Sequence, residues 1–334
     1  DEKGQKMRKS KGNVINPIET IDEYGSDALR LGIVAARGAG QNQAFSINKV
    51  VAGRNFCNKL WNIARFIEGK LPEQFELDEP TVDSLADHWI VRQLNAAAVD
   101  VAEQIEKYRF AEASEIVYHT IWDDVADWYI EASKKHDNPQ LMAWVLDTSL
   151  RLAHPFAPFV TETIWQTLGW RKELLISAAW PTPLEYNDIA AGQFEQLQKL
   201  VIEARFIVTE LPGNAKYDLL YQEDSLIEDN AELIQHLARL KSVQKADQAR
   251  GVRLAASNRE AWLDVDADTL YEHQTNQEVR LAETHQLIKN LQGRLANPNY
   301  VDKAPAHLVE ETRQQLTAAE ELAERLIREL DVLN

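Results

Sequence analysis

The spacing of apolar residues predicts long amphipathic helices through the first half of the chain. Residues 46–68 carry the clearest pattern, and Ser46 is placed to cap the helix. At 100° per residue one side gathers apolar and small residues, namely Val50, Gly53, Cys57, Leu60, Trp61, Ala64 and Ile67. The opposite side is polar and comprises Asn55, Asn58, Lys59, Asn62 and Arg65. Phe66 falls on that polar side, where a core residue is not expected.

Similar periodicity predicts further helices joined by short turns. Residues 18–40 read as one helix that closes on Gly38 and Gly40. The remaining predicted helices of this half cover 83–107, 110–136, 139–153 and 158–169. Repeated long helices with short connections are typical of a helical bundle, which we expect to extend to about residue 185.

The pattern changes after residue 186. A predicted helix over 193–211 ends at Pro212-Gly213, and short alternating runs follow: "AKYDLLYQ", "GVRLAAS" and "EAWLDVD". Ser257-Asn258 is placed as the turn of a hairpin between the last two runs. These features predict a small α/β unit over 186–270.

From about residue 271 the pattern becomes that of a coiled coil. In the last helix the apolar residues are spaced alternately by three and four positions: Leu316, Ala319, Ala323, Leu326, Leu330 and Leu333. A matching stripe lies upstream at Leu281, Ile288, Leu291 and Leu295. The chain is therefore predicted to be mainly α, with a connecting segment over 1–40, a bundle over 41–185, the α/β unit, and an antiparallel coiled-coil hairpin over 271–334.

Composition narrows the class of protein. The chain has 334 residues, 45% of them hydrophobic and 27% charged, as in ordinary soluble domains. No apolar run approaches the ~18 residues of a membrane span, so no membrane association is expected. Cys57 is the only cysteine, which excludes a disulfide framework and a Cys-rich zinc site and fits a cytoplasmic protein. Because Asp1 is not an initiator methionine, we expect an internal piece of a longer chain.

Charge is unevenly distributed along the chain. The net charge is -17, yet residues 1–70 carry 12 Lys and Arg against 7 Asp and Glu. The opening segment "KMRKSKGNVINP", residues 6–17, concentrates cations around Gly12 and Asn13. Such a loop is suited to fold over a phosphate chain and offset charge that develops at phosphorus. A solvated basic turn, or a localisation-type basic cluster, is the alternative interpretation.

The order of residues in this loop resembles the K-M-S-K-S loop of class I aminoacyl-tRNA synthetases. Further matches to the family are "YGSDALRL" (24–31), "NFCNKLWNIARF" (55–66), "DWYIEASK" (127–134) and "HPFAPFVTETIW" (154–165). Together they indicate the valine, isoleucine and leucine subgroup. The segment "LANPNYVDKAPAHLVEE" is similar to the C-terminal hairpin of the valyl-tRNA synthetases, whereas the isoleucine enzymes usually end in Cys-rich zinc modules.

The resemblance implies that the complete protein activates valine with ATP and transfers it to valine tRNA, as a monomer. By position Lys9 would steady the triphosphate during adenylation, with Lys6 assisting and Ser10 beside them at the ATP phosphates. Mg²⁺ is expected with ATP, and no metal site is expected in this stretch. Arg8 stands where the family usually has serine. The sequence has no His-x-Gly-His segment, so the chain alone is expected to be inactive.

The resemblance also implies roles in RNA binding. Sequence in RNA is read mostly on unpaired bases, by stacking and hydrogen bonds. The polar side of helix 46–68 offers such groups, and the resemblance implies anticodon contacts for Lys59, Asn62, Arg65 and Phe66. The alternative interpretation of this polar side is a solvated face with one exposed aromatic residue. We expect Trp122, Trp128 and Tyr129 in the core and His154 in a hydrogen bond within the bundle.

The C-terminal hairpin would brace the elbow of the tRNA. A different class of function remains open from the sequence: a non-catalytic helical RNA-binding or scaffold protein derived from a synthetase. The reading frame before Asp1 would separate the two readings, because only a synthetase gene would encode the His-x-Gly-His half there.

Overall fold

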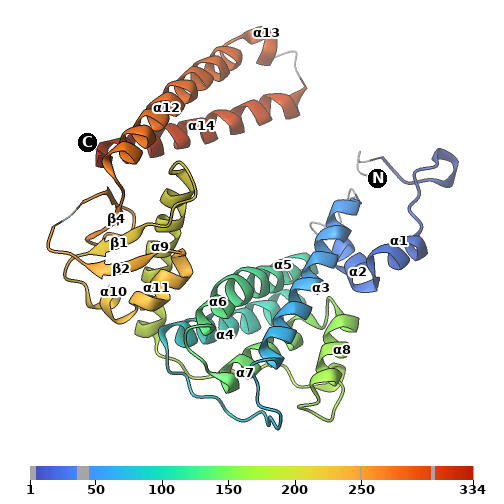
Figure 1. Ribbon diagram of the computed structural model, residues 1–334. Coiled ribbons are helices and arrows are strands. Elements are labelled where there is room, and N and C mark those ends of the chain that lie inside the picture. Colours follow the sequence, from blue (N-terminus) through green and yellow to red (C-terminus); the bar gives the residue numbers. More distant parts are fainter. Residues whose placement is uncertain (1–4, 36–44, 249, 302–304, 334) are drawn as a thin grey trace. The chain divides into compact units, whose positions relative to one another are not determined.

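The computed structural model describes residues 5–35, 45–248, 250–301 and 305–333. The chain divides into two compact units, Asp1–Glu195 and Gln196–Asn334 (Figure 1). The prediction of a mainly helical chain with a small sheet and a C-terminal helical hairpin is confirmed. The division between units falls inside one helix, while the boundaries near 185 and 270 stay predictions.

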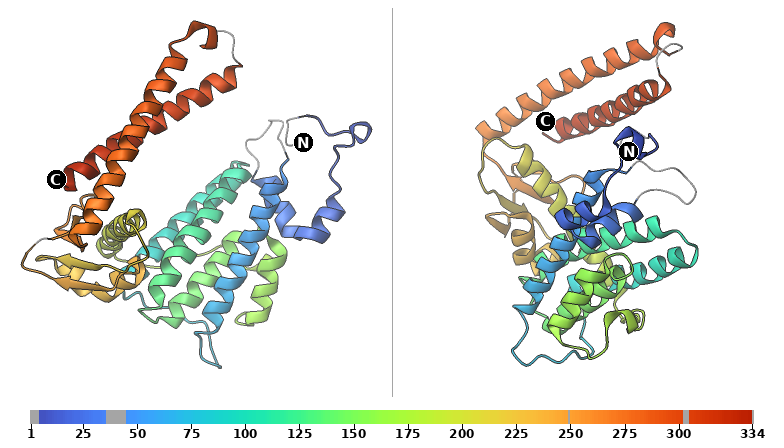
Figure 2. Two further views of the ribbon diagram at one scale, coloured as in Figure 1. Left: turned by 45° about the horizontal axis from the view of Figure 1, so that its top comes forward. Right: turned by 90° about the vertical axis from the view of Figure 1, so that its right-hand side faces the viewer.

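The first unit is built from helices. In chain order they are η1 (Lys9–Lys11), α1 (Pro17–Tyr24), α2 (Ser26–Val34), α3 (Ile47–Glu68), α4 (Leu85–Glu106), α5 (Phe110–His119), the π-helix η2 (Thr120–Tyr129), α6 (Ile130–Ser133), α7 (Pro139–Ala153), α8 (Pro158–Leu168), η3 (Leu175–Ser177) and the start of α9 (Asp188–Glu210). Figure 2 shows α3 running alongside the helices of the bundle. The predicted helix over 110–136 is therefore one helical path with a π-helical middle section.

The predicted helix over 18–40 is instead two helices. Asn16 caps α1 by accepting the Ile18 N–H at 3.1 Å. Gly25 has φ of 94°, a conformation that favours glycine, and there the chain breaks before α2. Apolar periodicity continues through both helices, which is why the sequence pattern did not reveal the break. The predicted end at Gly38 and Gly40 lies outside the described residues.

Helix α3 is confirmed, but its buried side is rotated from the predicted one. Ser46 caps it by accepting the Asn48 N–H at 3.2 Å. Trp61 is 39% exposed, whereas Leu60 is fully buried. The prediction that Trp61 belongs to the core is therefore wrong. The buried arc includes Phe56 and Ile63, a rotation of about 40° from the predicted centre at 100° per residue.

Two glycines explain how closely α2 and α3 pack. A Cβ added at Gly53 would lie 2.8 Å from the Ala28 carbonyl oxygen, and one at Gly32 would lie 2.9 Å from a Val50 methyl group. Larger residues would push the two helices apart. The sequence stripe that placed Gly53 on the inner side of α3 is thus confirmed.

The second unit combines a four-stranded sheet with helices. Its elements after α9 are β1 (Asp218–Tyr221), α10 (Ser225–Asp229), α11 (Ala231–Ala238), β2 (Ser242–Lys245), β3 (Val252–Arg253), β4 (Ala261–Asp264), α12 (Ala267–Leu295), α13 (Pro298–Val301) and α14 (Ala306–Leu333). The strand order is β2-β1-β4-β3, with β1 parallel to β2 and the other pairs antiparallel. The predicted hairpin is β3–β4, and Asn258 in its turn has φ of 54°. Strand β2 was not predicted.

Helices α12 and α14 lie side by side and are joined through α13 (Figures 1 and 2). On α14 the predicted seam is largely confirmed, because Ala319, Ala323, Leu326 and Leu330 are buried. The Leu333 side chain lies outside the described residues. On α12 only Leu291 of the predicted stripe is buried, together with three polar residues: His273, Gln277 and Thr284. Gln277, Thr284 and Leu291 repeat every seven residues, so polar groups occupy the deeper seam position.

Candidate nucleic-acid interface

The opening loop is closed by its own asparagine. The Arg8 N–H donates to Asn13 Oδ1 at 2.9 Å, and Asn13 Nδ2 lies 3.5 Å from the Lys6 carbonyl oxygen. Gly12 has φ of 66° at the turn. Lys6, Arg8 and Ser10 are exposed, and the side chain of Lys9 lies outside the described residues. The loop thus presents Lys6 and Arg8 to solvent, where an anion can reach them.

Helix α2, the second helix after the loop, is fastened to the bundle by Asp27. This buried carboxylate accepts the N–H of Phe159 at 3.2 Å and that of Val160 at 2.7 Å, at the first turn of α8. The free N–H groups at a helix start need such acceptors. Nearby, Arg30 Nη2 donates to the Pro155 carbonyl oxygen at 3.2 Å. The Asp-Ala-Leu-Arg segment matches the family in sequence, but its order of residues does not indicate this contact with α8.

Lys59 does not stand free on the outer side of α3. Its ammonium lies 2.8 Å from Asp127 Oδ1 on η2 and 5.0 Å from the ring centroid of Trp122. The side chains of Lys59 and Asp127 remain partly exposed, at 30% and 52%. Lys59 is therefore held between the carboxylate of Asp127 and the ring of Trp122, where α3 meets η2.

Trp122 is the outer member of an aromatic row. Its ring stacks on Tyr118 with centroids 5.5 Å apart and an interplanar angle of 12°. Tyr118 in turn stacks on Phe56, also at 5.5 Å. Phe56 is buried, whereas Tyr118 and Trp122 are half-buried. The expectation of a core position holds for Tyr129, which is buried, but Trp122 and Trp128 are only half-buried.

Phe66 lies about two turns beyond Lys59 on the same side of α3. It is half-buried, and Lys134 Nζ lies 5.8 Å from its ring centroid. Lys134 also lies 2.6 Å from Glu131 Oε1. Asn62 and Arg65 are exposed. The structure therefore places Lys59 and Phe66 beside η2 and α6, with Asn62 and Arg65 turned to solvent.

Carboxylates accompany these cations. Asp127 and Glu131 are each within ion-pair distance of a lysine, so the surface between α3 and η2 has little net positive charge. Asp124 is half-buried, and burial raises the pKa of its carboxyl to about 6, although a hydrogen bond from Gln93 opposes the rise. With little net positive charge, the surface between α3 and η2 is better suited to stacking and hydrogen bonding with bases than to general attraction of phosphates.

His154 makes a hydrogen bond within the bundle, as predicted. Its Nδ1 lies 2.8 Å from Thr161 Oγ1, within the bundle, and burial lowers the pKa of its ring. Cys57 is a poor nucleophile, because burial raises the pKa of its thiol to about 12. Neither residue joins the candidate interface.

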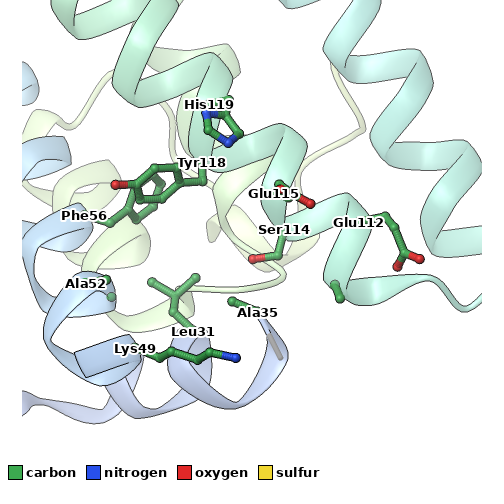
Figure 3. A pocket seen from close by; sticks show the side chains of 12 residues that line it. Leu31, Ala35, Lys49, Ala52, Phe56, Glu112, Ser114, Glu115, Tyr118 and His119 are labelled. Carbon is green, nitrogen blue, oxygen red and sulfur yellow. The ribbon is translucent and has the colours of Figure 1, made fainter. Parts of the chain in front are cut away.

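A cavity of about 580 Å³ opens between α2, α3 and α5 (Figure 3). Figure 3 shows Tyr118 over Phe56, and Lys49 and Glu112 on opposite walls. None of the residues predicted to bind ATP or RNA lines it. Within the described ranges, no three His, Cys, Asp or Glu side chains gather as a metal site. Among the helices of those ranges, none is long and apolar enough to cross a bilayer.

Three family profiles match the chain in order. Residues 1–46 match "tRNA synthetases class I (I, L, M and V)", residues 87–217 match "Anticodon-binding domain of tRNA ligase", and residues 270–334 match "Valyl tRNA synthetase tRNA binding arm". Helix α3, with Lys59 and Phe66, lies between the first two matched ranges. These profiles define the class as the class I aminoacyl-tRNA synthetases.

Individual relatives narrow the class. Valine–tRNA ligase of Petrotoga mobilis is 31% identical over 98% of this chain and 40% of the relative. That of Geobacillus stearothermophilus is 34% identical over 94% of this chain and 39% of the relative, and one from Bacillus cereus is 40% identical over 63% of this chain and 26% of the relative. The chain belongs to the valyl-tRNA synthetase family and matches the C-terminal portion of its members. It spans about 40% of the length of the curated relatives it matches.

Proposed function

We propose that the protein to which this chain belongs is a valine–tRNA ligase that activates valine with ATP and transfers it to valine tRNA. The chain supplies a phosphate-stabilising loop, the anticodon-binding bundle and the tRNA-binding arm. The observation that carries this proposal is the succession of the three matched regions along one chain, each on a structure of the expected kind.

In the phosphate loop, Lys6 and Lys9 stabilise charge on the triphosphate of ATP during adenylation, and Ser10 adds a hydrogen-bond donor. Support comes from the exposed cations of the loop and from its closure by Asn13. A loop already closed in one conformation loses less entropy when it binds an anion. Mg²⁺ would accompany ATP as part of the substrate.

In the bundle, Lys59, Asn62, Arg65 and Phe66 contact the anticodon loop. Support comes from the exposed amide of Asn62, the exposed guanidinium of Arg65 and the partly exposed ring of Phe66, all on one helix. Trp61 joins them as an exposed aromatic residue that the sequence pattern had placed in the core. Because Asp127 and Glu131 offset the nearby lysines, specificity would come from base contacts.

The experiment that tests the proposal is a binding comparison. We expect the chain to retain valine tRNA in a mobility-shift assay and to bind a valine tRNA with a substituted anticodon more weakly. The chain joined to a segment with the His-x-Gly-His half should catalyse valine-dependent exchange of pyrophosphate into ATP, and the chain alone should not. Equal binding of both tRNAs, or exchange with a different amino acid, would contradict the proposal.

A further inference from the structure

A second cavity, of about 560 Å³, lies in the second unit among α9, α12, α14 and β3. Ile202 and Phe206 from α9 supply apolar surface to its wall. Its volume falls within the range of roughly 300–1,000 Å³ that suits small organic ligands. No residue assigned to ATP or anticodon binding lies on it.

His273 and Gln277 line this cavity, and each carries a buried hydrogen-bond acceptor without a partner among the described residues. His273 is 4% exposed and Gln277 is 3% exposed. Among the described residues, neither His273 Nδ1 nor Gln277 Oε1 has a hydrogen-bond partner. The two residues are four apart on α12, so their side chains emerge on the same face about 6 Å apart. Two unsatisfied buried acceptors side by side call for a donor group in the cavity.

The protonation of His273 fixes the kind of group that fits. Burial lowers the pKa of its ring, and the hydrogen bond from the ring to the backbone of Glu210 only partly opposes this. The ring is therefore neutral near pH 7 and offers a lone pair at Nδ1. A neutral ligand amino group with two N–H bonds satisfies both acceptors, whereas a charged ammonium would be costly to bury between uncharged partners.

The wall that faces these acceptors is aromatic and basic. The guanidinium of Arg325 lies 4.8 Å from the ring centroid of Phe206. Arg328 and Lys199 also line the cavity and are exposed. The two carboxylates on the wall are occupied: Glu203 accepts the Ala256 and Ser257 N–H groups, and Glu210 pairs with Arg280 at 2.5 Å.

We propose that this cavity binds a nucleotide whose base carries an exocyclic amino group. The amino group donates to His273 Nδ1 and Gln277 Oε1, the base packs on Ile202 and Phe206, and the phosphate lies at Arg325 and Arg328. Adenine and cytosine fit this arrangement, and uracil does not because it lacks the amino group. The nucleotide is either free or an unpaired residue of RNA; only the second source rests on the proposed tRNA-binding function.

The test compares AMP, CMP and UMP as probes of the chain by NMR titration. We expect AMP and CMP to shift resonances of α9 and α12 and to bind roughly tenfold or more tightly than UMP, the penalty for unpaired buried acceptors. Gln277→Leu keeps the volume of the side chain and should remove most of this preference. Arg328→Gln should weaken all three nucleotides alike, and Gln286→Leu on the exposed face of α12 should change nothing.

Three results would overturn the proposal. They are no binding of any nucleotide, equal affinity for AMP and UMP, or an unchanged preference in Gln277→Leu. A rise in the melting temperature of Gln277→Leu without nucleotide binding would mean that only water occupies the acceptors, and this also overturns it. Arg328→Gln, at an exposed position, keeps the phosphate contact testable if Gln277→Leu fails to fold.

A single-stranded oligoadenylate and an oligouridylate of equal length distinguish RNA from free nucleotide. Preference for oligoadenylate over AMP, lost in Gln277→Leu, assigns the cavity to RNA. Preference for AMP over oligoadenylate assigns it to free nucleotides. Should valine tRNA fail to bind while AMP is still preferred over UMP, the proposed function fails and the cavity assignment stands.

Discussion

Lys59 on α3 and Asp127 on η2 form an ion pair of 2.8 Å at the rim of the candidate RNA interface. The pair is partly exposed, so it contributes little to stability, typically below about 1 kcal/mol. It nevertheless holds the lysine against Trp122 and offsets its charge. An RNA ligand that engages Lys59 must therefore compete with Asp127.

Because Asp127 competes with RNA for Lys59, substitutions of these two residues should change tRNA binding in opposite directions. Asp127→Asn should strengthen binding of valine tRNA about threefold to tenfold, because the lysine is released, and Lys59→Ala should weaken it by a similar factor. Quantitative mobility shifts measure both, with the melting temperature as a check of folding. Glu103→Gln, which frees Lys107 just after the end of α4, is the matched control and should leave binding unchanged. Weaker binding in Asp127→Asn would show that the closed pair itself is the binding form.

Phe66 is the aromatic residue to test for stacking. Because it is only half-buried, Phe66→Ala should lower the free energy of unfolding by about 1 kcal/mol, well below the ~3–5 kcal/mol of a buried phenylalanine. It should weaken valine tRNA binding several-fold to a hundredfold, with a smaller loss for a tRNA of altered anticodon.

The control for Phe66 follows from the observed rotation of α3. Leu60 is fully buried, so Leu60→Ala should cost about 2–5 kcal/mol, whereas Trp61→Ala at an exposed site should cost far less. Thermal melts of the three variants compare these costs. If Phe66→Ala destabilises the chain as much as Leu60→Ala does, Phe66 is a core residue and its binding role is excluded.

The loop lysine is tested by kinetics in a protein that also contains the His-x-Gly-His half. Lys9→Ala should lower the rate of adenylation by ~100-fold or more and leave tRNA binding nearly intact. Arg8→Ser should alter the adenylation rate more than tRNA affinity. Equal losses of rate and tRNA affinity in Lys9→Ala would point to a structural role for this lysine.

Asp27 is predicted to stabilise the junction of α2 and α8. Asp27→Ala leaves the Phe159 and Val160 N–H groups without their acceptor, and should cost about 1–2 kcal/mol of unfolding free energy. Chemical denaturation measures this loss. Asp22→Ala, an exposed position on α1, is the control and should be nearly neutral. A neutral Asp27→Ala would mean that solvent replaces the carboxylate at the start of α8.

Asp124 gives a pH-dependent prediction. The pKa of its carboxyl is about 6 in the folded chain, above the ordinary value of 3.8, so the folded state binds a proton more tightly than the unfolded state. Its contribution to stability is therefore largest below pH 3.8 and is lost as pH rises through 6. Asp124→Asn should raise the melting temperature relative to the parent chain at pH 8 and less so at pH 5. A difference independent of pH would contradict the raised pKa.

The order of elements could be predicted from the sequence because it is local. Helix caps such as Ser46 and the repeat of Ala319, Ala323 and Leu326 depend on neighbours a few residues away. The K-M-R-K-S segment likewise pointed to its family through the order of its residues. Strand β2 could not be predicted, because it is short, carries only one apolar residue, Val243, and forms a strand beside β1.

Side-chain partners across the fold were decided by tertiary packing alone. The periodicity of α3 predicts its amphipathic character, but contacts with other helices determine which arc is buried. Because of these contacts Trp61 is exposed and Phe66 is half-buried. Asp127 is 68 residues from Lys59 in the chain, and no pattern in either segment encodes their pairing. Gln277 lies at a seam position that a hydrophobic repeat would pass over, yet it is buried because α9 and α14 enclose that turn of α12. Local periodicity fixes which segments become helices, whereas the rotation of each helix and the partners of its polar groups depend on surfaces that only the folded chain brings together.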